Sequence, residues 1–211
     1  MVNVSKILDE LSRVVDAIVL GMMWLLFSIP IVTIGASSAA FYHAYHECIR
    51  RRRGYAWKEF ISGFKGNFAK ATKIWLVVLV VIAIAFVDGI AVLSTEEANQ
   101  FHGMFLVFVA AILVCTLVWA LYLFPCIARF EMRLQTIMKN CGIIAIANLP
   151  WTLLLLLIFG IAVFIPLLAP GLCFFTPTAY MFFANRILER VFRKYMTPED
   201  QETQEGLIRN D

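Results

Sequence analysis

Three long stretches of this 211-residue chain contain no Asp, Glu, Lys or Arg, and they limit its fold more than any other feature. They are residues 17–46, 98–128 and 140–185. A helix that crosses a lipid bilayer needs about 20 consecutive apolar residues, so each stretch is long enough for at least one crossing. The chain is also 61% hydrophobic, well above the share found in soluble domains. The sequence therefore predicts an all-α, polytopic integral membrane protein and excludes a soluble fold.

Two segments are each predicted to cross the membrane once. Residues 74–93 are apolar apart from Asp88, and residues 105–127 lie inside the second charge-free stretch. The third stretch is long enough for two crossings. Its centre reads Ile-Pro-Leu-Leu-Ala-Pro-Gly, and proline followed by glycine ends one helix and begins a turn. We therefore expect a hairpin of helices over residues 142–165 and 172–192.

The first charge-free stretch allows two interpretations. Ile29-Pro30 and Gly35 share the spacing Ile-Pro, four residues, Gly with the segment from Ile165 to Gly171. If the two segments are related, residues 14–28 and 36–49 form a first helical hairpin and the protein has six membrane segments, which is the interpretation we favour. If this stretch instead forms one long kinked helix, the protein has five membrane segments.

Basic residues set the expected orientation, because cytoplasmic loops of membrane proteins accumulate Lys and Arg. Residues 47–73 contain eight Lys or Arg and two Glu, whereas residues 88–104 contain three acidic residues and no Lys or Arg. The first segment is therefore predicted to be cytoplasmic and the second external. The same rule places the C-terminus in the cytoplasm. The basic-residue rule does not settle the side of the N-terminus. The six-segment interpretation places it in the cytoplasm.

An amphipathic helix is predicted just before residue 74. Its apolar side chains recur at helical spacing and form a stripe along one face, with lysines on the other faces. This pattern suits a helix in the cytoplasmic headgroup layer. Docking on a cytosolic partner is the alternative. The stripe consists of Trp57, Phe60, Ile61, Phe64 and Phe68.

The end of the chain differs in composition from the rest. Residues 197–211 contain five acidic residues and one Arg, with few apolar side chains. Such a segment cannot bury enough apolar surface to fold. We expect residues 1–196 to form a single membrane-embedded domain, followed by a mobile acidic cytoplasmic tail at 197–211.

Candidate chemical sites are few. His43, His46 and Glu47 share a helical face, and two imidazoles with a carboxylate are possible metal ligands. Their order, however, differs from the His-Glu-x-x-His of zinc proteases. Asp88 is the one acid inside a predicted span, where an ionisable group is by default a functional hypothesis, although it also lies near the outer interface. The sequence contains no nucleotide-binding or acyl-transfer motif, so no enzymatic activity, no cofactor and no nucleic-acid binding are predicted.

Several short motifs resemble those of one bacterial family. They are Ile-Pro-Ile-Val-Thr-Ile-Gly-Ala at 29–36, Ala-Ala-Phe-Tyr at 39–42, Phe-Lys-Gly-Asn-Phe at 64–68 and Leu-Pro at 149–150. Together they resemble the YesL-like family of membrane proteins, a domain of unknown function (624). The resemblance implies a bacterial cytoplasmic membrane and an association with carbohydrate ABC importers. It supplies no catalytic residues.

The sequence thus predicts an accessory or assembly component that packs against the permease subunits of a sugar importer within the lipid bilayer. A small-solute or ion carrier is the alternative, in which Asp88 or the turns at Pro30 and Pro166 would line the path. A third hypothesis is a metal-dependent membrane enzyme that uses His43, His46 and Glu47. The sequence does not determine the substrate, the partner or the oligomeric state.

Overall fold

A computed structural model describes residues 4–50, 54–93, 100–130 and 133–195, and these residues are almost entirely helical with no β-strand among them. The all-α prediction is confirmed for this part of the chain. The predicted acidic tail at 197–211 lies outside the described residues. The helices are α1 (Val4–Phe27), α2 (Ile34–Tyr45), α3 (Ala56–Leu93), α4 (Gln100–Arg129), α5 (Leu134–Ala147), α6 (Leu149–Leu168) and α7 (Thr176–Arg193).

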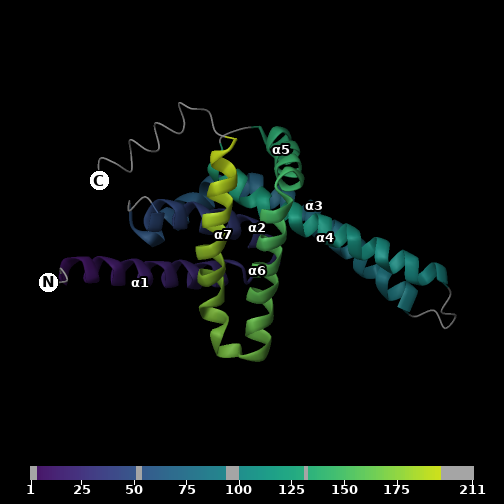
Figure 1. Cartoon of the computed structure of the whole chain (residues 1–211), viewed down its shortest axis with the longest axis horizontal. Coiled ribbons are helices and arrows are strands. Elements are labelled where there is room, and N and C mark those ends of the chain that lie inside the picture. The colour runs from purple at the N-terminus through teal and green to yellow at the C-terminus, as the bar shows by residue number, and fades with distance from the viewer. Residues whose placement is uncertain (1–3, 51–53, 94–99, 131–132, 196–211) are drawn as a thin grey trace.

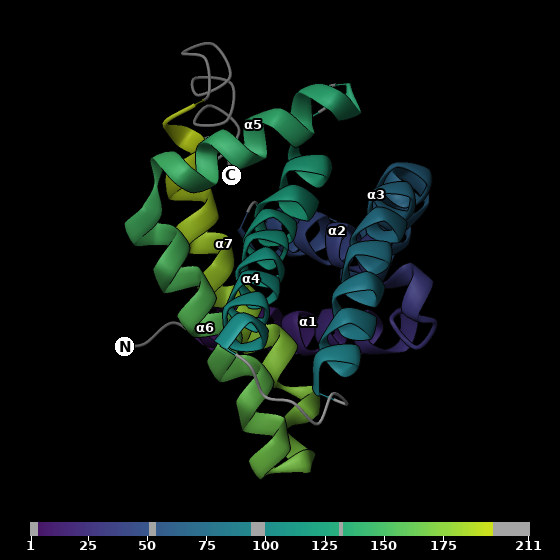
Figure 2. The same cartoon turned by 90° about the vertical axis from the view of Figure 1, so that its right-hand side faces the viewer.

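The helices pair into hairpins around a central α2. Figure 1 shows α6 and α7 side by side, and shows the α3–α4 hairpin projecting away from the other helices. Figure 2 shows α5 running across the top of the molecule between the ends of α4 and α6. Helix α2 packs against α1, α3, α4 and α7. It is therefore the element through which most of the fold is connected.

Small residues allow α2 to occupy this central position. Its buried residues include Gly35, Ala36, Ser37, Ala39 and Ala40, and small side chains let neighbouring helices approach closely in membrane proteins. The approach is tightest at the glycine. A Cβ atom there would lie 2.6 Å from the Cβ of Trp75 on α3 and 2.8 Å from a ring carbon of Phe124 on α4.

Both Ile-Pro motifs lie where one helix gives way to the next. Pro30 follows the end of α1 and precedes a 3-10 turn at Ile31–Thr33. The Thr33 hydroxyl donates to the carbonyl oxygens of Phe27 and Pro30. Pro166 instead lies within the last turn of α6, and the 3-10 turn that follows is Pro170–Phe174. The two segments share the predicted helix-turn-helix form but differ in where the proline falls.

Three described helices are long and apolar enough to cross a membrane: Ala56–Val92, Gly103–Arg129 and Leu149–Leu168. They correspond to three of the predicted spans. The twelve residues of α2 rise only about 18 Å, whereas the hydrocarbon core is roughly 30 Å thick. The six-segment arrangement therefore stays a prediction.

Two helices begin away from their predicted starts: α1 at Val4 rather than residue 14, and α7 at Thr176 rather than residue 172. Two further boundaries are wrong. The helix expected over residues 142–165 begins at Leu149, because Asn148 leaves helical geometry and its side-chain amide donates to the carbonyl of Ile144 and to the Tyr195 hydroxyl, each at 2.9 Å. The amphipathic segment before residue 74 is not a separate helix. It is the first part of α3, whose 38 residues run without a break over about 57 Å.

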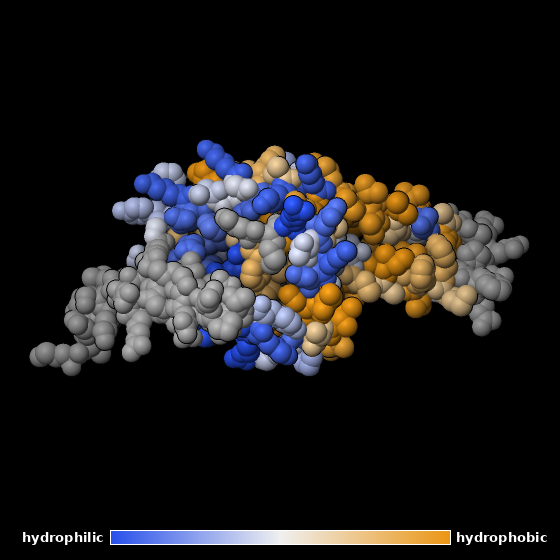
Figure 3. Space-filling view, turned by 90° about the horizontal axis from the view of Figure 1, so that it is seen from above, coloured by the Kyte–Doolittle hydropathy of each residue, from blue (hydrophilic) through white to orange (hydrophobic). Residues whose placement is uncertain are grey.

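Hydropathy divides the molecule along its length. Figure 3 shows hydrophobic side chains over the projecting α3–α4 hairpin and hydrophilic ones at the opposite end. In the most apolar windows of α3 and α4, only 17% and 11% of the residues are buried within the protein. Because soluble proteins rarely expose apolar surface of this extent, the hairpin requires lipid or another membrane chain, as does α6, whose apolar window is also only 11% buried.

Candidate functional site

A buried carboxylate joins three of the packed segments. Glu189 on α7 is only 1% exposed. Its Oε1 accepts a 2.7 Å hydrogen bond from the hydroxyl of Tyr42 on α2, and lies 3.2 Å from Nδ1 of His46 and 3.6 Å from Nε of Arg129. His46 begins the π-helical turn after α2, and Arg129 ends α4.

The surroundings of Glu189 compensate for its burial. A buried carboxylate is costly unless it is paired and hydrogen-bonded, and here a guanidinium and a phenol supply both kinds of partner. The Tyr42 hydroxyl donates to this carboxylate from α2. The cluster fastens α2, α4 and α7 to one another.

Sequence reasoning missed this cluster. Of its four members, the sequence singles out only His46, as a possible metal ligand with His43 and Glu47. One signal was present: Asn185, Glu189 and Phe192 recur at helical spacing, and all three are buried. A carboxylate on the apolar face of a helix is a reason to look for a charged partner on another helix.

The three candidate metal ligands do not converge. His43 Nε2 lies 3.6 Å from Oε2 of Glu59 on α3, whereas the His46 ring faces Glu189. Glu47 is half-buried in the turn after α2. Within the part of the chain that the structure describes, no three His, Cys, Asp or Glu side chains are grouped so that they could hold a metal ion.

The predicted aromatic stripe is divided between the core and the surface. Phe60 is 0% exposed, and with half-buried Phe64 it packs against Phe27 of α1 at ring distances of 5.4 and 5.0 Å. Trp57 is 52% exposed and Phe68 is also exposed, while Ile61 is half-buried. The exposed Trp57 and Phe68 can still contact a headgroup layer or a cytosolic partner, so the predicted surface role of the stripe stays a prediction.

Asp88 lies about one turn from the end of α3 and is half-buried. It does not line the cavity described next. The structure therefore leaves its predicted role as an intramembrane acid untested.

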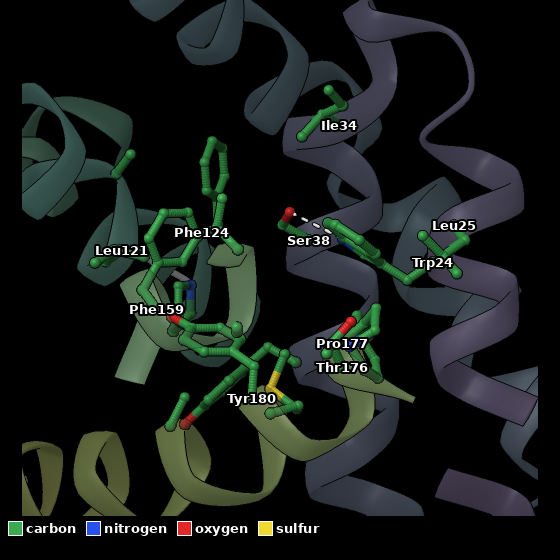
Figure 4. Close-up of a pocket in the computed structure, with 18 of the residues that line it drawn as sticks. Trp24, Leu25, Ile34, Ser38, Leu121, Phe124, Phe159, Thr176, Pro177 and Tyr180 are labelled. Atoms are coloured by element: carbon green, nitrogen blue, oxygen red, sulfur yellow. Dashed lines mark hydrogen bonds between the residues drawn. The ribbon is translucent and has the colours of Figure 1, made fainter. Parts of the chain in front are cut away.

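An apolar cavity of about 490 Å³ lies beside the carboxylate cluster. Figure 4 shows residues of α1, α2, α4, α6 and α7 surrounding it, among them Trp24, Phe124, Phe159 and Tyr180. None of the lining residues is charged. Its two small hydroxyl residues have partners within the protein. Ser38 accepts a 3.1 Å hydrogen bond from Trp24 Nε1, and Thr176 donates to carbonyls of the preceding turn.

The cavity and the cluster share a wall. Tyr42 lines the cavity and binds Glu189, and Leu188 lines the cavity next to Glu189 in sequence. The arrangement places a chamber suited to hydrocarbon directly against a buried charged group. Chemically, the chamber can hold an apolar molecule by contact and presents few polar atoms to a hydrophilic one.

These helices and their apolar surfaces define an α-helical membrane protein. Residues 17–89 match the model of a family described as "Protein of unknown function, DUF624". The match confirms the predicted resemblance over the segment from the second half of α1 to near the end of α3, which includes Tyr42 and His46. No curated protein and no solved structure matches the chain.

Proposed function

We propose that this protein is a non-enzymatic accessory or assembly component of a carbohydrate ABC importer in a bacterial cytoplasmic membrane, with its C-terminus in the cytoplasm. In this proposal it packs laterally against the permease subunits. The observation that carries the proposal is the α3–α4 hairpin, which projects from the other helices (Figure 1) and buries only 17% and 11% of the residues in its most apolar windows within the described chain. The choice of an importer as the partner rests on the family resemblance.

The hairpin offers an extended apolar surface. In a bilayer, helices associate through close side-chain packing rather than through exclusion of water, so a long, projecting pair of helices can contact a permease along its whole length. The exposed large side chains on this surface include Val77, Val80, Ile84 and Val87 on α3, and Val107, Phe108 and Val114 on α4.

A solute carrier is less well supported. A sugar path needs hydrogen-bonding groups, yet the lining of the cavity is almost entirely apolar. Asp88, the acid that a carrier would use, lies outside that lining. If the protein were nevertheless a carrier, Asp88→Asn would abolish flux in liposomes, whereas the accessory role predicts no flux from the purified protein alone.

Photo-crosslinking in native cells tests the accessory role directly. A photoreactive amino acid replaces Val80 or Val107 on the hairpin, and Leu157 on the exposed face of α6 serves as the matched control. We expect permease subunits to be captured from the hairpin positions and not from the control. Failure to capture a permease, together with normal importer assembly in cells lacking the protein, would overturn the proposal.

A further inference from the structure

We propose that the apolar cavity binds one acyl chain of a phospholipid from the surrounding bilayer. The inference rests on the cavity and its rim, and does not depend on the association with a permease.

Occupancy follows from the size and lining of the cavity. Protein interiors are close-packed and seldom leave voids much larger than a water molecule. A chamber of about 490 Å³ falls within the range of ligand pockets, which is roughly 300 to 1,000 Å³. Apolar cavities stay dry and take up apolar molecules. An empty chamber would also forfeit the contacts of its lining, so an apolar occupant is favoured.

Access to the cavity is from the lipid-facing side. Val163 lines the cavity and is 51% exposed, and Leu25 and Ile34 are half-buried lining residues. Val163 lies on α6, one of the three helices apolar enough to span a membrane, and only 11% of the α6 window is buried. The rim therefore meets the surface that α6 presents to the bilayer. A hydrocarbon chain can pass this rim without crossing charged surface.

The length of the cavity suits an acyl chain. On α7 the lining residues extend from Thr176 to Leu188, which corresponds to about 18 Å of helix. One leaflet of hydrocarbon is about 15 Å thick, half of the bilayer core. An acyl chain from one leaflet can therefore fill the chamber lengthwise. Ser38 and Thr176 already have hydrogen-bonding partners, and the rest of the lining is mostly apolar, so contact with hydrocarbon matches the chamber best.

Tryptophan quenching tests this assignment. In a variant that keeps only Trp24, with the other four tryptophans replaced by Phe, the indole reports from the cavity wall. The protein is reconstituted in vesicles of phosphatidylcholine with or without bromine on the acyl chains, because bromine quenches only at contact distance. We expect strong quenching of Trp24 by the brominated lipid, although its ring is half-buried.

A filling substitution and a matched control identify the cavity as the source. Ala162→Phe on α6 places a ring in the chamber and should reduce the quenching at least twofold. Gly160→Phe adds the same ring two positions away, where a side chain meets open space, and should leave the quenching unchanged. Equal quenching in both variants, or none in the parent, would overturn the proposal.

A second measurement uses the full chain with its native tryptophans. Phosphatidylcholine carrying a diazirine on its acyl chain is photolysed in the reconstituted protein, and labelled peptides are mapped by mass spectrometry. Labelling at buried Met181, which lines the cavity, and its loss in Ala162→Phe support the proposal. Labelling confined to exposed positions such as Leu157 overturns it. Displacement of the label from Met181 by a few mole per cent of a polyisoprenyl phosphate would overturn the acyl assignment in favour of an isoprenyl chain.

Discussion

The Tyr42 hydroxyl donates a 2.7 Å hydrogen bond to Oε1 of Glu189, which lies 147 positions away in the sequence. The bond connects α2, inside the segment that matches the family model, to α7, outside it. Both side chains are almost completely buried. Together with Arg129, the pair brings the two ends of the fold into one polar cluster.

Removing the charge of Glu189 should destabilise the protein. Glu189→Gln keeps the size of the side chain but removes the buried negative charge that faces Arg129, His46 and Tyr42. Breaking a buried pair in this way costs about 3 kcal/mol. Unfolding by a denaturing detergent, followed by tryptophan fluorescence, measures the loss. Glu59→Gln is the control, because Glu59 is partly exposed and surface pairs contribute less than about 1 kcal/mol. Equal unfolding free energies for Glu189→Gln and the parent would contradict the role assigned to the cluster.

The hydroxyl of Tyr42 should contribute less than the charge of Glu189, and the two contributions should be coupled. Tyr42→Phe removes one hydrogen bond to a buried carboxylate, which is expected to lower the free energy of unfolding by about 1.5 to 3 kcal/mol. In combination with Glu189→Gln, the second change should cost less than it does alone, because the charged acceptor is already gone. Strict additivity of the two substitutions would show that the hydrogen bond does not contribute.

The sequence predicts the helices well and their packing poorly. The C-terminal ends of α1 and α3 and the turns near Pro30 and Pro166 follow from apolar runs and proline, which are local properties. The break between α5 and α6 at Asn148 depends partly on a hydrogen bond with Tyr195, far along the chain. A pattern of apolar residues does not reveal such a distant partner.

The site was predicted less completely than the fold for the same reason. His46 was identified as a candidate functional residue, but its partner in the structure is Glu189 rather than His43 or Glu47. Phe60 belongs to a stripe that helical spacing alone assigns to a membrane surface, yet it is buried against α1. In each case the partner comes from a distant helix, so only the folded chain reveals it.

Any side chain at Gly35 should destabilise the protein, because α2 lies close to α3 and α4 at this position. In Gly35→Ala the new Cβ would lie 2.6 Å from Trp75 Cβ and 2.8 Å from Phe124, so α2 must move away from α3 or α4. Overpacking of this kind costs about 1 to 3 kcal/mol. Gly89→Ala, in the same family segment but with open space around it, should be neutral or slightly stabilising, since alanine favours helix. Equal stability of the two variants would contradict the packing of α2.

Oxidation should join α4 to α5 through a native pair of cysteines. Cys126 near the end of α4 and Cys141 on α5 are both buried, and the two helices pack against each other. A membrane-permeable oxidant should therefore form this disulfide in preference to pairs that involve Cys48, Cys115 or Cys173. Peptide mapping by mass spectrometry identifies the linked peptides, and Cys141→Ser is the control that should abolish them. Because a disulfide requires the two Cβ atoms to lie only about 3.5 to 4.5 Å apart, efficient formation would establish that α5 packs across the end of α4. Complete alkylation of both thiols after oxidation would contradict that packing.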